Sequence, residues 1–191
     1  MTFLELVNKR SSVRKYTAKP IPREVINRCL EAARLAPSAC NAQPWSFIIV
    51  DDPVLRDKIA AAAFSGMYSM NSFARTAPAF VVVVRERSGQ FAAIGGFFRG
   101  VRYNLIDIGI ACEHFILQAA EDDVRTCWLG WFNERAVKRI LGIPKSKKAD
   151  IMISMGYSGE ENARQKIRKP LDEMRAFNSN SKIVCFPRRR A

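Results

Sequence analysis

The stretch from about Arg99 to Glu121 limits most strongly how this chain can fold, because apolar side chains occupy nearly every face of the helix that it predicts. A helix that is apolar all round must be buried. In a chain of 191 residues, a subunit interface is a natural place to cover the face that one core cannot reach. The stretch therefore predicts a central helix and a homodimer. Its apolar residues are Val101, Leu105, Ile106, Ile108, Ile110, Ala111, Phe115, Ile116, Leu117, Ala119 and Ala120.

The remaining pattern predicts helices and strands within one domain. Thr2 is expected to cap a helix that runs to about Arg10, and Pro37 to end a helix that starts after Pro22. No internal repeat or long linker is visible, so we expect one domain over residues 1–175 and a basic extension over 176–191, either disordered or docked as an arm. Strands are predicted at 45–50, 80–85, 124–132 and 150–157, helices at 53–63 and 133–141, and a loop or short helix lining a pocket at 64–79.

The chain is strongly basic, with 31 Lys and Arg against 18 Asp and Glu and a net charge of +13. Such a charge attracts polyanions, so nucleic-acid binding is the alternative function to weigh. The basic residues are spread along the chain apart from 145–148 and 188–190, and no zinc-finger, RNA-binding or basic-zipper pattern accompanies them. We therefore expect nucleic acid not to be the partner and interpret the charge as solubility and attraction for anionic ligands.

The sequence offers few side chains for metal binding or for nucleophilic catalysis. Its five cysteines are widely spaced with no Cys-x-x-Cys, which predicts reduced thiols. Cys40 is expected to be a small buried thiol, and a position near a bound cofactor is the alternative. The single histidine, His114, falls in the apolar helix and is predicted to be structural, so no metal site is expected. The glycines at 95–100 lack the P-loop pattern and predict a turn. No secretion signal or membrane anchor is recognised, and a cytoplasmic location is the default expectation.

A cluster of phosphate-binding residue types lies near the N-terminus, in Arg10-Ser11-Ser12-Val13-Arg14. Arg10 and Arg14 share a side in either a helix or a strand, and Ser12 joins them only if the segment is extended. Arginine forks and a serine hydroxyl suit a phosphate monoester. Lys166 and Arg168, also spaced for one side of an extended segment, could close on the same phosphate. A solvated helix end is the alternative interpretation of the first cluster, and a common basic loop that of the second.

A second polar segment, residues 36–45, lies between a predicted helix and a predicted strand. Pro37 and Pro44 fix its backbone, and the amides of Asn41 and Gln43 suit the edge of a heterocycle. A purely structural turn is the alternative. With an anion site but few candidate acids, bases or nucleophiles, a cofactor that carries its own reactive atom is the economical explanation.

The order of these motifs, followed by Trp128-Leu129-Gly130 and by Lys166 to Pro170, resembles the nitroreductase-like family of FMN flavoproteins, over about Phe3 to Leu171. The resemblance implies an α+β fold with a central, mostly antiparallel mixed sheet flanked by helices. It also implies a domain-swapped-type homodimer with FMN at the subunit interface.

Carried over position by position, the resemblance implies a full set of cofactor-binding residues and no catalytic side chain, because N5 of the flavin carries the hydride. The phosphate set is Arg10, Ser12, Lys166 and Arg168. Ser11 and Arg14 are expected at the ribityl chain or the pyrimidine edge, and Asn71 at the pyrimidine. The partner subunit would supply Pro37, Ser38, Asn41 and Gln43. The backbone of Trp128, Leu129 and Gly130 is expected near N5.

The implied reaction has two steps: NADH or NADPH reduces FMN and leaves, and a second substrate such as a nitroaromatic or a quinone is then reduced in the same pocket. The sequence selects neither the nicotinamide donor nor the acceptor. Leu129 stands where some members have an acid, and the basic tail has no clear counterpart. The alternative is a basic protein that binds FMN or nucleic acid without turnover.

Overall fold

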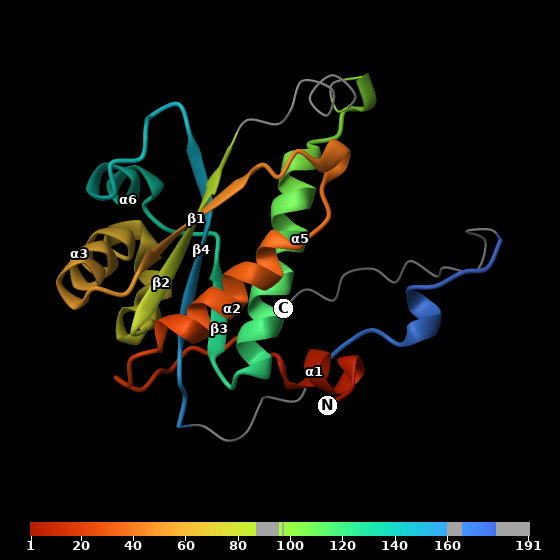
Figure 1. Ribbon diagram of the computed structural model, residues 1–191, viewed down its shortest axis with the longest axis horizontal. Coiled ribbons are helices and arrows are strands. Elements are labelled where there is room, and N and C mark those ends of the chain that lie inside the picture. The colour runs from red at the N-terminus through yellow and green to blue at the C-terminus, as the bar shows by residue number, and fades with distance from the viewer. Residues whose placement is uncertain (87–95, 97, 160–165, 179–191) are drawn as a thin grey trace.

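The computed structural model describes residues 1–86, 96, 98–159 and 166–178. A four-stranded sheet of order β1-β2-β4-β3 lies at its centre (Figure 1). Its three strand pairs are antiparallel, and one isolated parallel bridge joins Ser12 to Thr126 on β3. The α+β fold with a mostly antiparallel sheet is confirmed. The strands are β1 (Trp45–Val50), β2 (Ala79–Arg85), β3 (Arg125–Leu129) and β4 (Lys148–Gly156).

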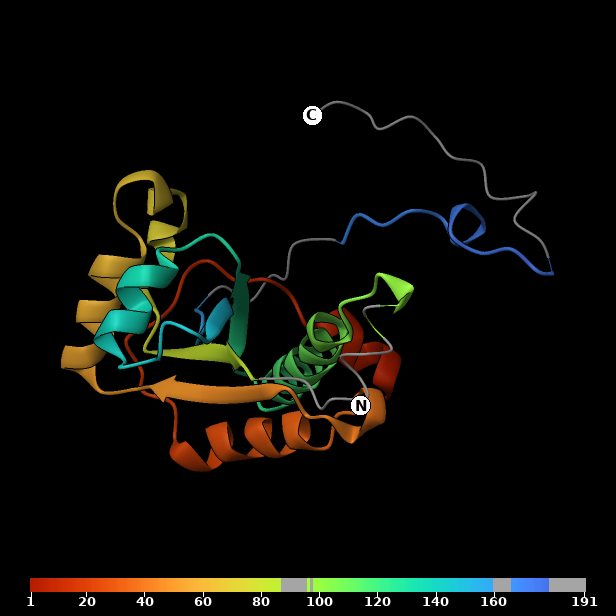
Figure 2. The same ribbon diagram turned by 90° about the horizontal axis from the view of Figure 1, so that it is seen from above.

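Helices cover both faces of the sheet (Figure 2). Successive side chains of a strand point to opposite faces. Accordingly Val82 packs in the core beneath α3 and α6, whereas Val81 packs in the core beneath α2 and α5. With both faces covered, β2 is buried along nearly its whole length. The helices are α1 (Phe3–Lys9), α2 (Arg23–Arg34), α3 (Pro53–Ala63), α5 (Tyr103–Glu121) and α6 (Glu134–Ile140), with 3₁₀ segments η1 (Ala39–Asn41), η2 (Gly66–Thr76) and η3 (Leu171–Glu173).

The central helix predicted from the apolar stretch is α5. Its residues Ile108, Ala111 and Phe115 are buried against α2 and the sheet. It begins at Tyr103 rather than near Arg99, because Gly100 adopts a φ of +62° that interrupts a helix. One face stays uncovered in the single chain, where Ile106 is 52% exposed.

Several local predictions are confirmed in detail and one is adjusted. The Thr2 hydroxyl accepts a hydrogen bond from the Glu5 backbone amide at 3.3 Å, and Asn133 Oδ1 accepts one from the Ala136 amide at 3.1 Å, so both caps form. The segment expected as a loop or short helix contains η2. The strand expected to reach Phe132 ends at Leu129, because the following residues turn toward η2, where Trp131 Nε1 donates to the Met67 carbonyl at 3.0 Å.

The segment from Lys166 to Asn178 runs away from the helix-and-sheet body in both views (Figures 1 and 2). It starts beside α1, where the Lys166 amine donates to the Val7 carbonyl. Beyond that point it exposes Ile167, Leu171, Met174 and Phe177. Among the described residues, nothing buries these apolar side chains.

Gly156→Ala is expected to destabilise the fold by about 1–3 kcal/mol, the usual cost of overpacking. An added Cβ at this strand end would lie 2.5 Å from Cδ of Pro78, a ring fixed to the backbone, and 3.0 Å from Tyr16 Cδ1. The measurement is urea unfolding of the apoprotein. Gly130→Ala is the control, since its Cβ would meet nothing within 4 Å. Equal stability of the two variants would contradict the prediction.

Candidate functional site

The segment Arg10–Arg14 lies in extended conformation along the open edge of β3. Ser12 bridges to Thr126, and the Val13 amide donates to the Thr126 carbonyl at 3.0 Å. The Tyr16 hydroxyl donates to the Val13 carbonyl at 2.8 Å, which fixes the segment from the other side. The condition under which Ser12 joins Arg10 and Arg14 on one side is therefore met. Ser11 is partly exposed and Ser12 is exposed.

Three basic side chains gather where α1 ends. The pKa of Lys166 is lowered first by partial burial and then by the positive charges of Arg10 and Arg168, against a weaker opposing effect of Glu113. Within the described ranges, no carboxylate forms an ion pair with either guanidinium, and Arg168 donates only to the carbonyl of its neighbour Ile167, at 2.8 Å. Like charges held together in this way favour an anion between them. The structure thus brings Arg10, Lys166 and Arg168 together.

β3 begins beside this cluster, where Arg125 Nη1 donates to the Lys9 carbonyl at 3.3 Å, and the residues after its other end contact η2. Along β3, Thr126, Cys127 and Leu129 are buried, whereas Trp128 is exposed. Gly130 is exposed, with no atom within 4 Å of the position that a Cβ would take. Backbone at this glycine can therefore be approached closely by a flat group.

Asn71 lies at a kink of η2 and points to the chain that leaves β3. Its Nδ2 donates to the Trp131 carbonyl at 2.8 Å. The Tyr68 and Trp131 rings also pack together, with centroids 5.3 Å apart. The amide nitrogen of Asn71 thus fastens η2 to the residues after β3, and its side-chain oxygen accepts no hydrogen bond from the described residues.

Arg14 extends from the edge of β3 toward η2. Its Cζ lies 5.7 Å from the centroid of the Phe73 ring, a cation–π contact. It also lies close enough to Cys127 to lower the pKa of that thiol, against the larger effect of burial, which raises it. Phe73 belongs to the segment 64–79 that the sequence predicts to line a pocket, but its contact with Arg14 was not predicted.

The polar turn at 37–43 is folded on itself. The Gln43 amide donates to the Ser38 hydroxyl at 3.0 Å, and Gln43 Nε2 donates to Asn41 Oδ1 at 3.0 Å. Cys40, Asn41 and Gln43 all adopt positive φ. Cys40 is exposed, which corrects the expectation of a buried thiol: in this tight left-handed turn its side chain points away from the core. Pro37 is also exposed.

This turn lies far from the basic cluster within one chain. The Ala39 amide donates to Asp107 near the start of α5, at 3.2 Å, whereas the Lys9 amine donates to the Glu121 carbonyl at its end, at 3.3 Å. At 1.5 Å per residue, these two points on α5 are about 21 Å apart. The structure therefore does not bring Pro37, Ser38, Asn41 and Gln43 to Arg10. Asp107 is only 4% exposed. The sequence did not predict that it would hold the polar turn, although an acidic residue within an otherwise apolar stretch is a sign of a specific role.

Other features do not add a site. Among the described residues, no three His, Cys, Asp or Glu side chains are arranged to hold a metal ion. His114 Nδ1 lies 3.3 Å from the Ala32 carbonyl oxygen, as a structural histidine would. In the part of the chain that the structure describes, no helix is both long and apolar enough to span a membrane. The tail at 179–191 lies outside the described residues, and so do residues 95 and 97 of the glycine-rich stretch at 95–100.

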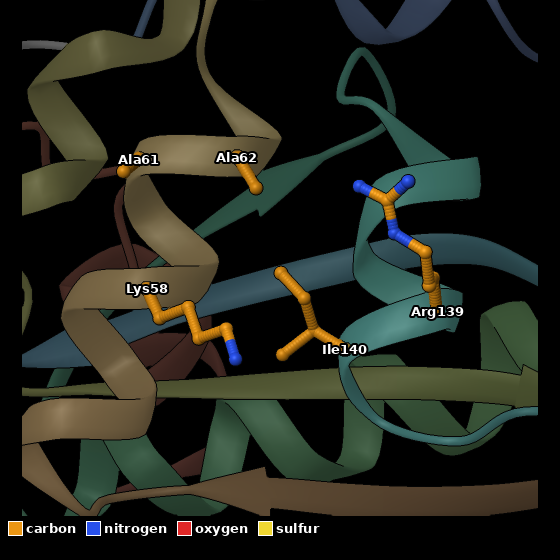
Figure 3. A pocket seen from close by; sticks show the side chains of 5 residues that line it. All are labelled: Lys58, Ala61, Ala62, Arg139 and Ile140. Carbon is orange, nitrogen blue, oxygen red and sulfur yellow. The ribbon is translucent and has the colours of Figure 1, made fainter.

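A groove between α3 and α6 is separate from the candidate site (Figure 3). Lys58, Ala61, Ala62, Arg139 and Ile140 line it. None of the residues predicted to bind the cofactor is among them, and both cations face solvent. Substitutions of Lys58 or Arg139 can therefore serve as controls for substitutions of the lysine and arginines in the basic cluster.

The chain was compared with known sequences and structures. The sequence model of the nitroreductase family matches residues 7–157. A protein of Archaeoglobus fulgidus, provisionally named an NADH dehydrogenase/NAD(P)H nitroreductase, is 30% identical over 83% of this chain and 86% of its own length. A nitroreductase family protein of Clostridium novyi NT is 28% identical, with a TM-score of 0.69 over 82% of this chain and 85% of that chain. An FMN-dependent nitroreductase of Clostridium difficile R20291, 24% identical, shares the fold, with a TM-score of 0.72 over 93% of this chain and 99% of that chain.

Proposed function

This chain belongs to the nitroreductase family, and on that premise we propose that it is an FMN-dependent oxidoreductase. NADH or NADPH would serve as the electron donor, and a small molecule such as a nitroaromatic or a quinone as the acceptor. Family membership supports the oxidoreductase class, and the names of the relatives support nicotinamide and flavin chemistry. When bound, FMN supplies the atom that accepts and donates hydride.

The observation that carries the proposal is the convergence of Arg10, Lys166 and Arg168. Their charges repel one another, and no described carboxylate pairs with either guanidinium. A phosphate monoester offers the negative charge and the acceptor oxygens that such a cluster needs. We assign the FMN phosphate to these residues together with Ser12, which the extended backbone puts on the same side.

The rest of the cofactor would extend from this cluster along β3 toward its exposed end. Ser11 and Arg14 would bind the ribityl chain or the pyrimidine edge, and Asn71 would offer its side-chain oxygen there. The backbone of Trp128, Leu129 and Gly130 would border the hydride-carrying side of the ring, where the open space at Gly130 allows close approach. None of these assignments requires a side chain to act as an acid or a base.

We also propose that the working unit is a homodimer. The turn that carries Pro37, Ser38, Asn41 and Gln43 is too far from the basic cluster to serve the same FMN within one chain. A second copy can supply it. The exposed apolar side chains of α1 and α5, among them Phe3, Leu4 and Ile106, offer the surface that a dimer would cover. The single domain at 1–175 and the basic extension at 176–191 are part of the same proposal.

Purified protein tests the proposed function directly. We expect about one FMN per chain, loss of the oxidised flavin absorbance on anaerobic addition of NADH or NADPH, and its return when a quinone is added. Protein that is colourless and takes up no added FMN would contradict the proposal. Bound FMN that neither nicotinamide reduces would instead support the binding protein without turnover.

A further inference from the structure

The side chain of Arg14 is held by two uncharged groups. Its guanidinium lies over the Phe73 ring, with Cζ 5.7 Å from the centroid, and it contacts the sulfur of Cys127. Burial raises the pKa of the Cys127 thiol, so the sulfur is neutral near pH 7. Among the residues that the structure describes, no carboxylate pairs with Arg14.

Phe73 is itself fixed in place. Its ring is half-buried and packs against the core beneath α3 and α6. Its carbonyl accepts a hydrogen bond from the Thr76 hydroxyl at 3.0 Å. Two residues earlier, Asn71 ties η2 to the Trp131 carbonyl at 2.8 Å. The ring therefore offers a rigid face to a long side chain that would otherwise sample many rotamers.

Whether the group that holds Arg14 is a carboxylate or an aromatic ring decides how much positive charge the guanidinium presents to a ligand. A carboxylate would fix the guanidinium but would also cancel most of its field. An aromatic face attracts the cation through its quadrupole and leaves the net charge unchanged. Arg14 is thus a positioned cation with its full charge available to a ligand at the end of β3.

We infer that Phe73 is a positioning residue for the flavin: it holds Arg14 at the pyrimidine edge while leaving its positive charge uncompensated. The inference rests on the proposed function. Reduction adds negative charge to the pyrimidine side of a flavin, so a fixed cation there stabilises the reduced form more than the oxidised one. Phe73 would then help to set the reduction potential without touching the reacting atoms.

The test is the midpoint potential of bound FMN in Phe73→Leu, which removes the ring and keeps an apolar side chain. We expect binding of reduced FMN to weaken about 3- to 10-fold more than binding of oxidised FMN, given the strength of cation–π contacts. For a two-electron couple this lowers the potential by about 15–30 mV. Phe73→Tyr keeps the ring and should restore the wild-type potential.

A double-mutant cycle separates positioning from a general structural effect. In an Arg14→Gln background, Phe73→Leu should cause no further shift of the potential. Phe177→Leu is the matched control, because Phe177 makes a similar contact with Arg175, at 5.8 Å, outside the candidate site. If Phe73→Leu does not fold, Phe73→Met provides a second ring-free variant.

The outcomes are distinct. A wild-type potential in Phe73→Leu, or an equal shift with and without Arg14, would overturn the inference while leaving the FMN-dependent activity intact. Wild-type protein that binds no FMN would overturn the proposed function itself. Loss of the shift in the Arg14→Gln background, together with rescue by tyrosine, would support Phe73 as a positioning residue.

Discussion

Arg10→Ala is expected to weaken FMN binding by about 10- to 100-fold, because a charge-assisted hydrogen bond to phosphate contributes roughly 1.5–3 kcal/mol. The Arg10 guanidinium has no described ion-pair partner whose loss would complicate the result. Its backbone amide, which donates to the Leu6 carbonyl at 2.9 Å, is unaffected by the substitution. The measurement is fluorescence titration of the apoprotein with FMN.

The apoprotein of Arg10→Ala should be as stable as wild type or slightly more stable. The substitution removes a positive charge from a cluster that already contains Lys166 and Arg168. Lys166→Ala should weaken FMN binding similarly but should also cost some apoprotein stability, since the Lys166 amine donates to the Val7 carbonyl. Thermal unfolding without FMN separates these contributions.

Arg139→Ala is the matched control for Arg10→Ala. It removes the same side chain and the same charge from the exposed groove between α3 and α6. FMN affinity should therefore stay at the wild-type value in this variant. Equal weakening in both variants would mean that overall charge, rather than a phosphate site at Arg10, attracts the cofactor.

The sequence predicts the regular elements well, because their signals are local. The periodicity of α5, the caps at Thr2 and Asn133 and the apolar run of β2 each depend on residues within a few positions of one another. The extended conformation of Arg10–Arg14 is different. It depends on the bridge between Ser12 and Thr126, which are distant in the sequence, so the sequence pattern left helix and strand open.

The arrangement of the site was less predictable, because it too depends on contacts between residues that are distant in the sequence. The exposure of Cys40 follows from left-handed backbone that includes Cys40 and Gln43, two residue types that rarely adopt it, and Asp107 holds this turn from α5. The contact between Arg14 and Phe73 depends on how η2 packs against the end of β3. Side-chain neighbours of this kind are decided by tertiary packing, which neither spacing nor propensity specifies.

Ile106→Glu is expected to convert the proposed dimer to monomers and to release FMN with them. Ile106 is 52% exposed on α5, next to Asp107, the residue that holds the polar turn. A dimer would carry the substitution twice. At about 2 kcal/mol or more for each buried, uncompensated polar group, the dissociation constant should rise by roughly a thousandfold or more. The folded protomer should tolerate the change, because an acid in the first turns of a helix is favourable.

Sedimentation equilibrium and FMN content, measured on the same samples, test this prediction. Val54→Glu is the control, since Val54 is an exposed apolar residue on α3, in the layer on the other side of the sheet. It should leave both the dimer and its FMN unchanged. A dimeric Ile106→Glu variant would remove this face of α5 from the interface. A monomeric variant that retains FMN would show that one chain is sufficient, and the assignment of Pro37, Ser38, Asn41 and Gln43 to the partner's cofactor would then be wrong.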